Sequence, residues 1–160
     1  MQENAYQSMA EIARDFCAHV ESFSEDQVEE WLQGMATMLP RLDEAARELG
    51  NAKSTSVHEQ NPEDEGRFEL FTRLYEALGE RDGYNYEFDA REGQRLSGSL
   101  ADDITDIYFD LKRGLELLKQ YPAEPAIAAS DWQQSFEFHW RHHLVDAERQ
   151  LSRPANVMSH

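Results

Sequence analysis

The sequence predicts an all-α protein, an irregular up-and-down bundle of four longer helices and one short helix. Two observations predict this class. Apolar residues recur at steps of three and four along most of the chain, which is the spacing of one helix face. No Gly-rich phosphate loop joins a strand to a helix. The 160 residues fit one domain. We therefore expect a single bundle over 1–151 and a frayed tail over 152–160.

The first two helices are the most regular. The inward stripe of the first, over about 5–23, is Met9, Ile12, Phe16, Val20 and Phe23. Ser24 and Gln27 fit a capping box, so a second helix is expected to follow and to end at Gly50. Its apolar positions form a heptad seam: Val28, Leu32, Met35, Leu39, Leu42, Ala46 and Leu49. Such a seam suits either a partner helix of the same chain or a second copy.

The middle of the chain is less periodic. Residues 51–65 lack an apolar period and are predicted to form a mobile loop. A short helix is expected over about 66–80. Over about 82–98, Tyr84, Tyr86 and Phe88 alternate with polar residues, which fits either a short strand or an extended segment that lays aromatic rings on the bundle. Because no second strand is evident, we favour the extended segment.

Two long helices complete the bundle. Ser99 and Asp102 open the fourth, which has an apolar stripe to about Lys119. Pro125 suits a first helical position, and the last helix is expected over about 126–151.

Composition limits the partners and the compartment. The chain has 32 acidic and 15 basic residues, a net charge of -17. This acidity argues against nucleic acid and anionic membranes as partners, because phosphate contacts require Lys or Arg. Cys17 is the only cysteine, so no internal disulfide can form. No stretch approaches the roughly 18 apolar residues of a membrane span, and the N-terminal residues do not resemble a signal peptide. We expect a cytoplasmic protein.

Polar residues occupy unusual positions on the last two long helices. Asp103, Asp106 and Asp110 fall on one stripe beside the apolar face of the fourth helix. His139 and His143, one turn apart, project within the arc of the apolar residues of the last helix, and Asp146 borders them. Two His at this spacing can hold a metal ion from one helix, and carboxylates of a facing helix could complete its ligands.

Structural roles would also explain these residues. The aspartates would then form a solvated edge, with Arg113 pairing to Asp110, and each His would donate to a carboxylate or a Tyr hydroxyl. Specific metal signatures are missing: no Glu precedes a His by three residues, and there is no H-E-x-x-H and no Cys cluster.

Two stretches resemble a known family. SLADDITDIYFDLKRGLELL and DWQQSFEFHWRHHLVDAERQL are similar to motifs of the bacterial family catalogued as domain of unknown function 5063. The resemblance covers nearly the whole chain, from the first helix to about Leu151, although Arg141 stands where the family pattern has Gly. It implies an all-helical bacterial protein and brings no activity. The matching positions are Ser99, Asp102, Asp103, Asp106, Tyr108, Asp110, Lys112, Gly114, Trp132, Phe136, His139, Trp140, His143, Asp146 and Arg149.

Two hypotheses of function follow. The first is a non-enzymatic module that binds another protein or itself as a homodimer, motivated by the heptad seam and by Phe109, which lies opposite the inward stripe of its helix. The alternative is a divalent-metal protein, extending to a metal-dependent hydrolase, and no other cofactor is indicated. Its metal ligands would be His139, His143 and Asp146, in a cleft formed by Asp103, Asp106, Tyr108, Asp110 and Trp140.

Overall fold

The computed structural model describes residues 2–50, 66–89 and 94–151. The predicted loop over 51–65 and the predicted tail over 152–160 lie outside the described residues. Among the described helices, none combines the length and the apolar character that a membrane crossing requires.

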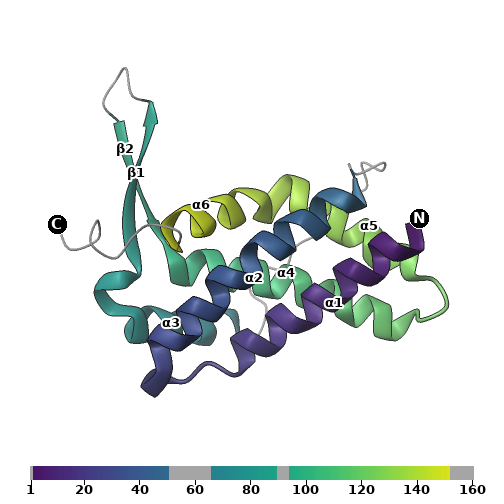
Figure 1. The fold of residues 1–160 in the computed structure, drawn as a ribbon, viewed down its shortest axis with the longest axis horizontal. Helices are drawn as coiled ribbons and strands as arrows, with labels where there is room; N and C mark the ends of the chain where they lie inside the picture. Colours follow the sequence, from purple (N-terminus) through teal and green to yellow (C-terminus); the bar gives the residue numbers. More distant parts are fainter. Residues whose placement is uncertain (1, 51–65, 90–93, 152–160) are drawn as a thin grey trace.

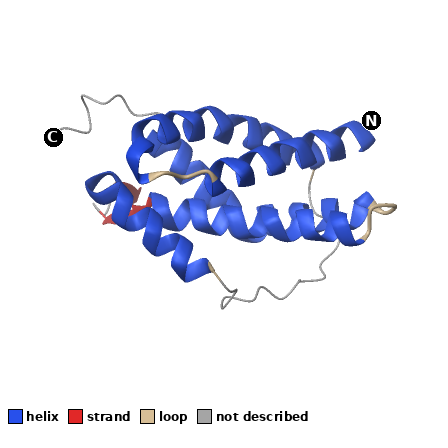
Figure 2. Cartoon of the chain, turned by 90° about the horizontal axis from the view of Figure 1, so that it is seen from below, coloured by secondary structure: helices blue, strands red, loops and turns tan. Residues whose placement is uncertain are grey.

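The predicted all-α fold is confirmed (Figures 1 and 2). The bundle contains α1 (Gln2–Glu21), α2 (Val28–Leu49), the short α3 (Arg67–Leu78) and α4 (Leu100–Gln120). The last long helix runs through α5 (Pro125–Ser135), the π-helical turn η3 (Phe136–Trp140) and α6 (Arg141–Leu151). Two single 3₁₀ turns, η1 (Glu25–Gln27) and η2 (Gly79–Arg81), precede α2 and follow α3.

Helix ends follow the local chemistry of the sequence. The Ser99 hydroxyl accepts a hydrogen bond from the backbone N–H of Asp102 and caps α4 as predicted. Gly50 ends α2 with a φ of 83°, a left-handed value that glycine adopts without strain. Pro125 occupies the first turn of α5, where its missing N–H costs no intrahelical bond.

Helix α4 lies at the centre of the bundle. It packs against α1, α3, α5 and α6, so each of these helices buries part of its apolar face on α4. The heptad seam of α2 is buried within the chain, with Met35, Leu39 and Leu42 fully inaccessible. The seam therefore needs no second copy to cover it.

Gly114 of α4 is the site of a close approach between helices. A Cβ atom at this position would lie 2.0 Å from Nε1 of Trp132 on α5. The same indole nitrogen donates a 3.2 Å hydrogen bond to the carbonyl of Leu111. Because Trp132 is almost completely buried, the bare backbone at Gly114 is what allows this ring to lie against α4.

Two strands, over 83–89 and 94–99, form a β-hairpin at the end of the bundle where α4 begins (Figure 1). Strand β1 (Gly83–Asp89) pairs antiparallel with β2 (Gln94–Ser99), so the expectation that no second strand pairs with this segment was wrong. The sequence of β2, QRLSGS, has little apolar alternation, which is why the pairing was missed.

Asp82 joins the base of the hairpin to α4. Its carboxylate accepts hydrogen bonds from the Ser99 hydroxyl, at 2.7 Å, and from the backbone N–H of Ala101, at 2.6 Å. The carboxylate is buried and lies at the positive end of the α4 dipole, where a negative charge is stabilising.

Candidate functional site

The aspartates of α4 face the last long helix. Asp110 is fully buried and Asp103 is 3% exposed, and the Asp106 side chain is mostly covered. Their spacing of three and four residues places all three on one side of α4, as predicted. The alternative that they form a solvated edge was wrong, because they meet His139 and His143.

His143 lies between two of these carboxylates. Its Nδ1 is 2.7 Å from Asp103 Oδ1, and its Nε2 is 2.9 Å from Asp106 Oδ2. Burial of the ring disfavours its charged form, but the hydrogen bonds with Asp103 and Asp106 outweigh burial and raise the pKa of His143 to about 10. Burial also acts to raise the pKa of Asp106, yet His143 and Arg67 lower it overall. When no metal ion is bound, the His143 ring is therefore protonated at neutral pH.

His139 is the first residue of a second series of polar contacts, which continues through Asp110 and Arg113 to Asp131. Its Nδ1 pairs with Asp110 Oδ2. A guanidinium nitrogen of Arg113 lies 3.1 Å from the other oxygen of Asp110, which confirms the predicted Arg113–Asp110 pair. Arg113 Nε also donates to both carboxylate oxygens of Asp131, at 3.1 Å each. Asp131 is buried on α5, so these contacts connect α4, α5 and the π turn η3.

Arg67, the first residue of α3, reaches the cluster from a third direction. Its guanidinium pairs with Asp106 Oδ1 and lies over the ring of Phe109, 5.0 Å from the ring centre. Phe109 is partly buried, and it is covered by Arg67. Within the described residues, Arg67 thus covers part of the face of α4 that lies opposite its inward stripe.

The π turn at Phe136–Trp140 sets the orientation of the cluster residues on the last helix. Residues 131 and 139 would lie about 80° apart around an uninterrupted α-helix, given roughly 100° per residue. The wider π turn reduces this difference, so Asp131 and His139 both face α4. Such turns occur often at functional sites in helices.

Three of these residues form a group that could bind a metal ion. Asp106, His139 and His143 each offer a ligand atom, and these atoms lie within 4.8 Å of one another. Asp102, Asp103 and His143 form a second, overlapping group. In the first group, Asp103 and Asp110 hold the Nδ1 atoms of the two imidazoles. A carboxylate in this position orients a metal-binding His and increases its basicity.

The other predicted site residues lie apart from this group. Tyr108 faces α1, where its hydroxyl donates a 2.6 Å hydrogen bond to Glu21. Trp140 is fully buried, and its indole N–H donates to the Ser135 hydroxyl. Asp146 is half-buried on α6 and belongs to neither ligand group; its charge acts on His142.

Sequence reasoning missed Arg67 and Asp131. Helical periodicity shows which residues share a face, but it does not show which helices pack together. Arg67 is separated from Asp106 by 39 positions in the chain. Asp131 could have been noticed as a charged residue directly before the apolar Trp132, but the π turn that aligns it has no known sequence signature.

Comparison with known proteins identifies the family of the chain. Its fold is similar to that of protein BF1032 from Bacteroides fragilis, with a TM-score of 0.69 and 22% identity over 92% of this chain and 93% of the other. This likeness concerns the fold alone. No curated protein matches the chain. Residues 2–154 match the model of the family described as Domain of unknown function (DUF5063), and the chain therefore belongs to this family.

Proposed function

We propose that the protein binds one divalent first-row metal ion through Asp106, His139 and His143. The proposal rests on one observation, which is that a buried carboxylate contacts each of the two imidazoles. Each His has its Nδ1 next to a buried carboxylate, Asp110 for His139 and Asp103 for His143. This leaves Nε2 of each ring available as the ligand atom, in the carboxylate–histidine–metal arrangement of known sites.

The spacing of the ligand atoms suits a metal ion. His143 Nε2 and Asp106 Oδ2 are 2.9 Å apart. Two ligands on adjacent corners of an octahedron, each about 2.1 Å from the ion, lie about 3.0 Å apart. The ion would replace the proton that these two atoms share.

The charges of the cluster also favour a cation. The cluster holds the four carboxylates of Asp103, Asp106, Asp110 and Asp131 and the two guanidinium groups of Arg67 and Arg113. The two guanidinium charges offset two of the four carboxylates, so two negative charges remain. Asp110 contacts the imidazole of His139, and Asp103 contacts that of His143. Two added protons or one divalent ion would balance the two negative charges, and an ion does so without charging both rings.

Three protein ligands leave at least one coordination position open. Catalytic metal sites keep such a position for water, whereas structural zinc sites are closed by four protein ligands. A metal-bound water is the nucleophile of metal-dependent hydrolases, so hydrolysis is the reaction class to which this proposal extends.

Metal titration tests the proposal. Protein treated with a chelator is titrated calorimetrically with Zn²⁺, Mn²⁺, Fe²⁺ and Mg²⁺, and its thermal unfolding is followed at each metal concentration. A ligand at one hundred times its Kd stabilises the fold by about 2.7 kcal/mol. Saturable binding of one ion per chain is expected, and no binding of any of these ions would overturn the proposal.

Variants connect the binding to these residues. His143→Ala and Asp106→Asn should abolish binding, because each removes a ligand. Asp110→Asn should weaken it about 10- to 100-fold, because it removes the support of His139. His142→Ala is the matched control, since His142 is adjacent, exposed and outside both ligand groups. Equal loss of binding in His142→Ala would count against the assignment.

Self-association is the second candidate function, and one observation favours it. Helix α3 exposes two aromatic side chains one heptad apart, Phe68 (75%) and Tyr75 (52%). Exposed aromatic pairs of this kind often mark interfaces. Light scattering at several concentrations tests this candidate: a dimer that Phe68→Glu converts to a monomer would support it, and a monomer at all concentrations would reject it.

A further inference from the structure

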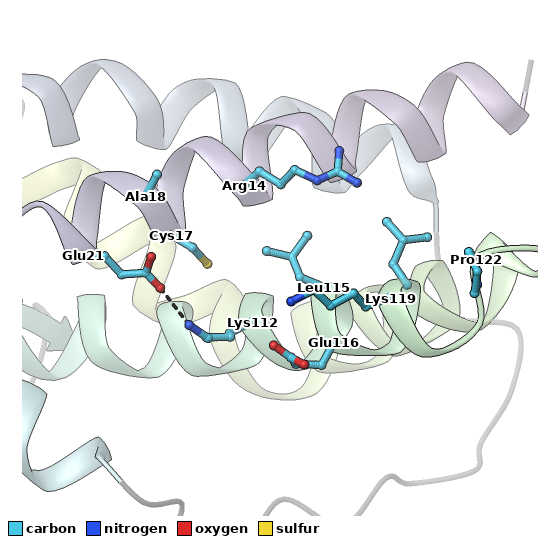
Figure 3. A pocket seen from close by; sticks show the side chains of 10 residues that line it. Arg14, Cys17, Ala18, Glu21, Lys112, Leu115, Glu116, Lys119 and Pro122 are labelled. Carbon is cyan, nitrogen blue, oxygen red and sulfur yellow. Dashed lines mark hydrogen bonds and ion pairs between the residues drawn. The ribbon is translucent and has the colours of Figure 1, made fainter.

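A groove runs between α1 and α4 (Figure 3). Its volume is about 550 Å³, within the range of roughly 300–1,000 Å³ that is typical of small-molecule sites. Figure 3 shows Arg14 extending from α1, and Leu115, Glu116 and Lys119 extending from α4. None of its lining residues belongs to the metal-ligand groups described above.

The floor of the groove is apolar. Leu115 and Leu118 are partly buried hydrophobic residues of α4 that pack against the core, and Cys17 of α1 is 5% exposed. The thiol of Cys17 is neutral at physiological pH, because burial raises its pKa to about 12. An aliphatic chain lying here would cover apolar surface without displacing a charged group.

One end of the groove carries a fixed ion pair. Lys112 lies 2.8 Å from Glu21, and Glu21 also accepts the hydrogen bond of Tyr108. These contacts lower the pKa of Glu21, with the Lys112 contact as the largest cause. The charge of Glu21 is therefore already compensated within the protein.

The remaining charges make the groove positive. Its lining holds the cations Arg14, Lys112 and Lys119 and the carboxylates Glu21 and Glu116, a net charge of +1 in a chain whose net charge is -17. Among the described residues, no ion pair or side-chain hydrogen bond involves Arg14 or Lys119. Other cations of the described chain, such as Arg41 and Arg81, pair with carboxylates. Two cations without such a pair thus flank one apolar floor.

We propose that this groove binds an amphipathic organic monoanion, a carboxylate with an aliphatic body. Its carboxylate lies between Arg14 and Lys119, and its aliphatic part covers Leu115, Leu118 and the side of Cys17. One negative charge balances the lining, and the apolar floor takes the remainder of the molecule. The proposal is independent of the metal site, since the two share no residue.

The first experiment uses decanoate as the probe. Calorimetric titration of the full chain, below the concentration at which decanoate forms micelles, should give saturable binding of one molecule. Decanol and decyltrimethylammonium have comparable chains without the negative charge, and each should bind at least tenfold more weakly. Amide chemical shifts in an NMR titration should change on α1 and α4.

Variants locate the binding. The double variant Arg14→Gln/Lys119→Gln removes both charges from exposed positions and should weaken decanoate binding at least tenfold. Ala18→Trp fills the groove from an exposed position of α1 and should abolish binding while the protein remains folded. Arg41→Gln, an equal charge change at an exposed position outside the groove, should leave the affinity unchanged.

Three results would overturn the proposal. The first is the absence of saturable binding when decanoate is titrated up to its micellar concentration. Decanol or decyltrimethylammonium could bind as tightly as decanoate, which would show that the charge is not recognised. Unchanged affinity in Ala18→Trp would place the binding elsewhere.

Discussion

His143 and Asp103 form a buried pair between α6 and α4, with 2.7 Å between His143 Nδ1 and Asp103 Oδ1. The second ring nitrogen of His143 contacts Asp106, so the ring joins two carboxylates that would otherwise repel each other. This single ring therefore affects both the stability of the fold and any binding of a metal ion.

The first prediction concerns the pH dependence of stability in chelator-treated protein. The pKa of His143 is about 10 in the fold against an ordinary value of 6.5. Because the folded pKa is the higher one, the protonated ring stabilises the fold fully below about pH 6.5, and this contribution is lost as the pH rises through about 10. His143→Gln, which does not titrate, should cost roughly 3 to 5 kcal/mol at pH 6 and progressively less towards pH 10.

Urea denaturation of both proteins at several pH values measures this difference. Asp102, Asp103, Asp106, His139, His142 and Arg67 surround the ring. The charge of His143 also acts on Asp102, Asp106 and His142, so these three groups contribute to the difference between the two proteins. A difference in the free energy of unfolding that stays constant from pH 6 to 10 would contradict the prediction.

The second prediction is that Gly114→Ala destabilises the protein. The new Cβ would meet the Trp132 ring, which has no space to move because it is almost completely buried. Overpacking of this kind costs about 1 to 3 kcal/mol, although alanine is a better helix former than glycine. Thermal unfolding measures the change. Gly83→Ala, at a position where nothing lies within 4 Å of the added Cβ, is the control. A Gly114→Ala protein as stable as the wild type would disprove the close approach.

The third prediction concerns Asp82. Asp82→Ala removes the acceptor of the Ser99 hydroxyl and of the Ala101 N–H, and leaves the buried N–H unpaired. Such a loss costs roughly 1 to 3 kcal/mol. Ser24→Ala, which removes a cap at an exposed hydrogen bond, should cost about 1 kcal/mol or less. Urea denaturation that ranks the two variants in the opposite order would reject this role of Asp82.

The fourth prediction is that Cys17 reacts slowly in the folded protein. Burial raises the pKa of its thiol to about 12, so very little thiolate is present at pH 8. Iodoacetamide should modify the native protein at least a hundredfold more slowly than the protein unfolded in urea. Mass spectrometry measures both rates. Comparable rates would show that the thiol is accessible in the native state.

Much of the bundle could be predicted from the sequence, because the inward residues of each helix repeat at the period of one helix face. The same argument placed Asp103, Asp106 and Asp110 on one side of α4 and His139 near His143. It did not show that these two sets meet, since that depends on which helices pack together. The cap residues Ser99 and Gly50 were predictable because their effect is local.

The β-hairpin and the π turn were not predictable in the same way. Strand β2 has no apolar alternation, and its pairing with β1 depends on the backbone rather than on a buried face. The π turn at Phe136–Trp140 depends on how α5 and α6 each pack against α4. Asp131 was missed for this reason, as an ideal helix turns it away from His139.

The orientation of the cluster residues depends on the number of residues in the π turn at Phe136–Trp140. A π turn contains one residue more than an α turn needs, so a single deletion there would restore a regular helix. Every cluster residue would still be present, and Asp131 and His139, then seven residues apart, would lie within about 20° of each other around the helix axis. A relative with a regular helix and a spacing of seven between these two residues therefore keeps the alignment that the π turn gives here at a spacing of eight, whereas a spacing of eight without the π turn separates the two by about 80°.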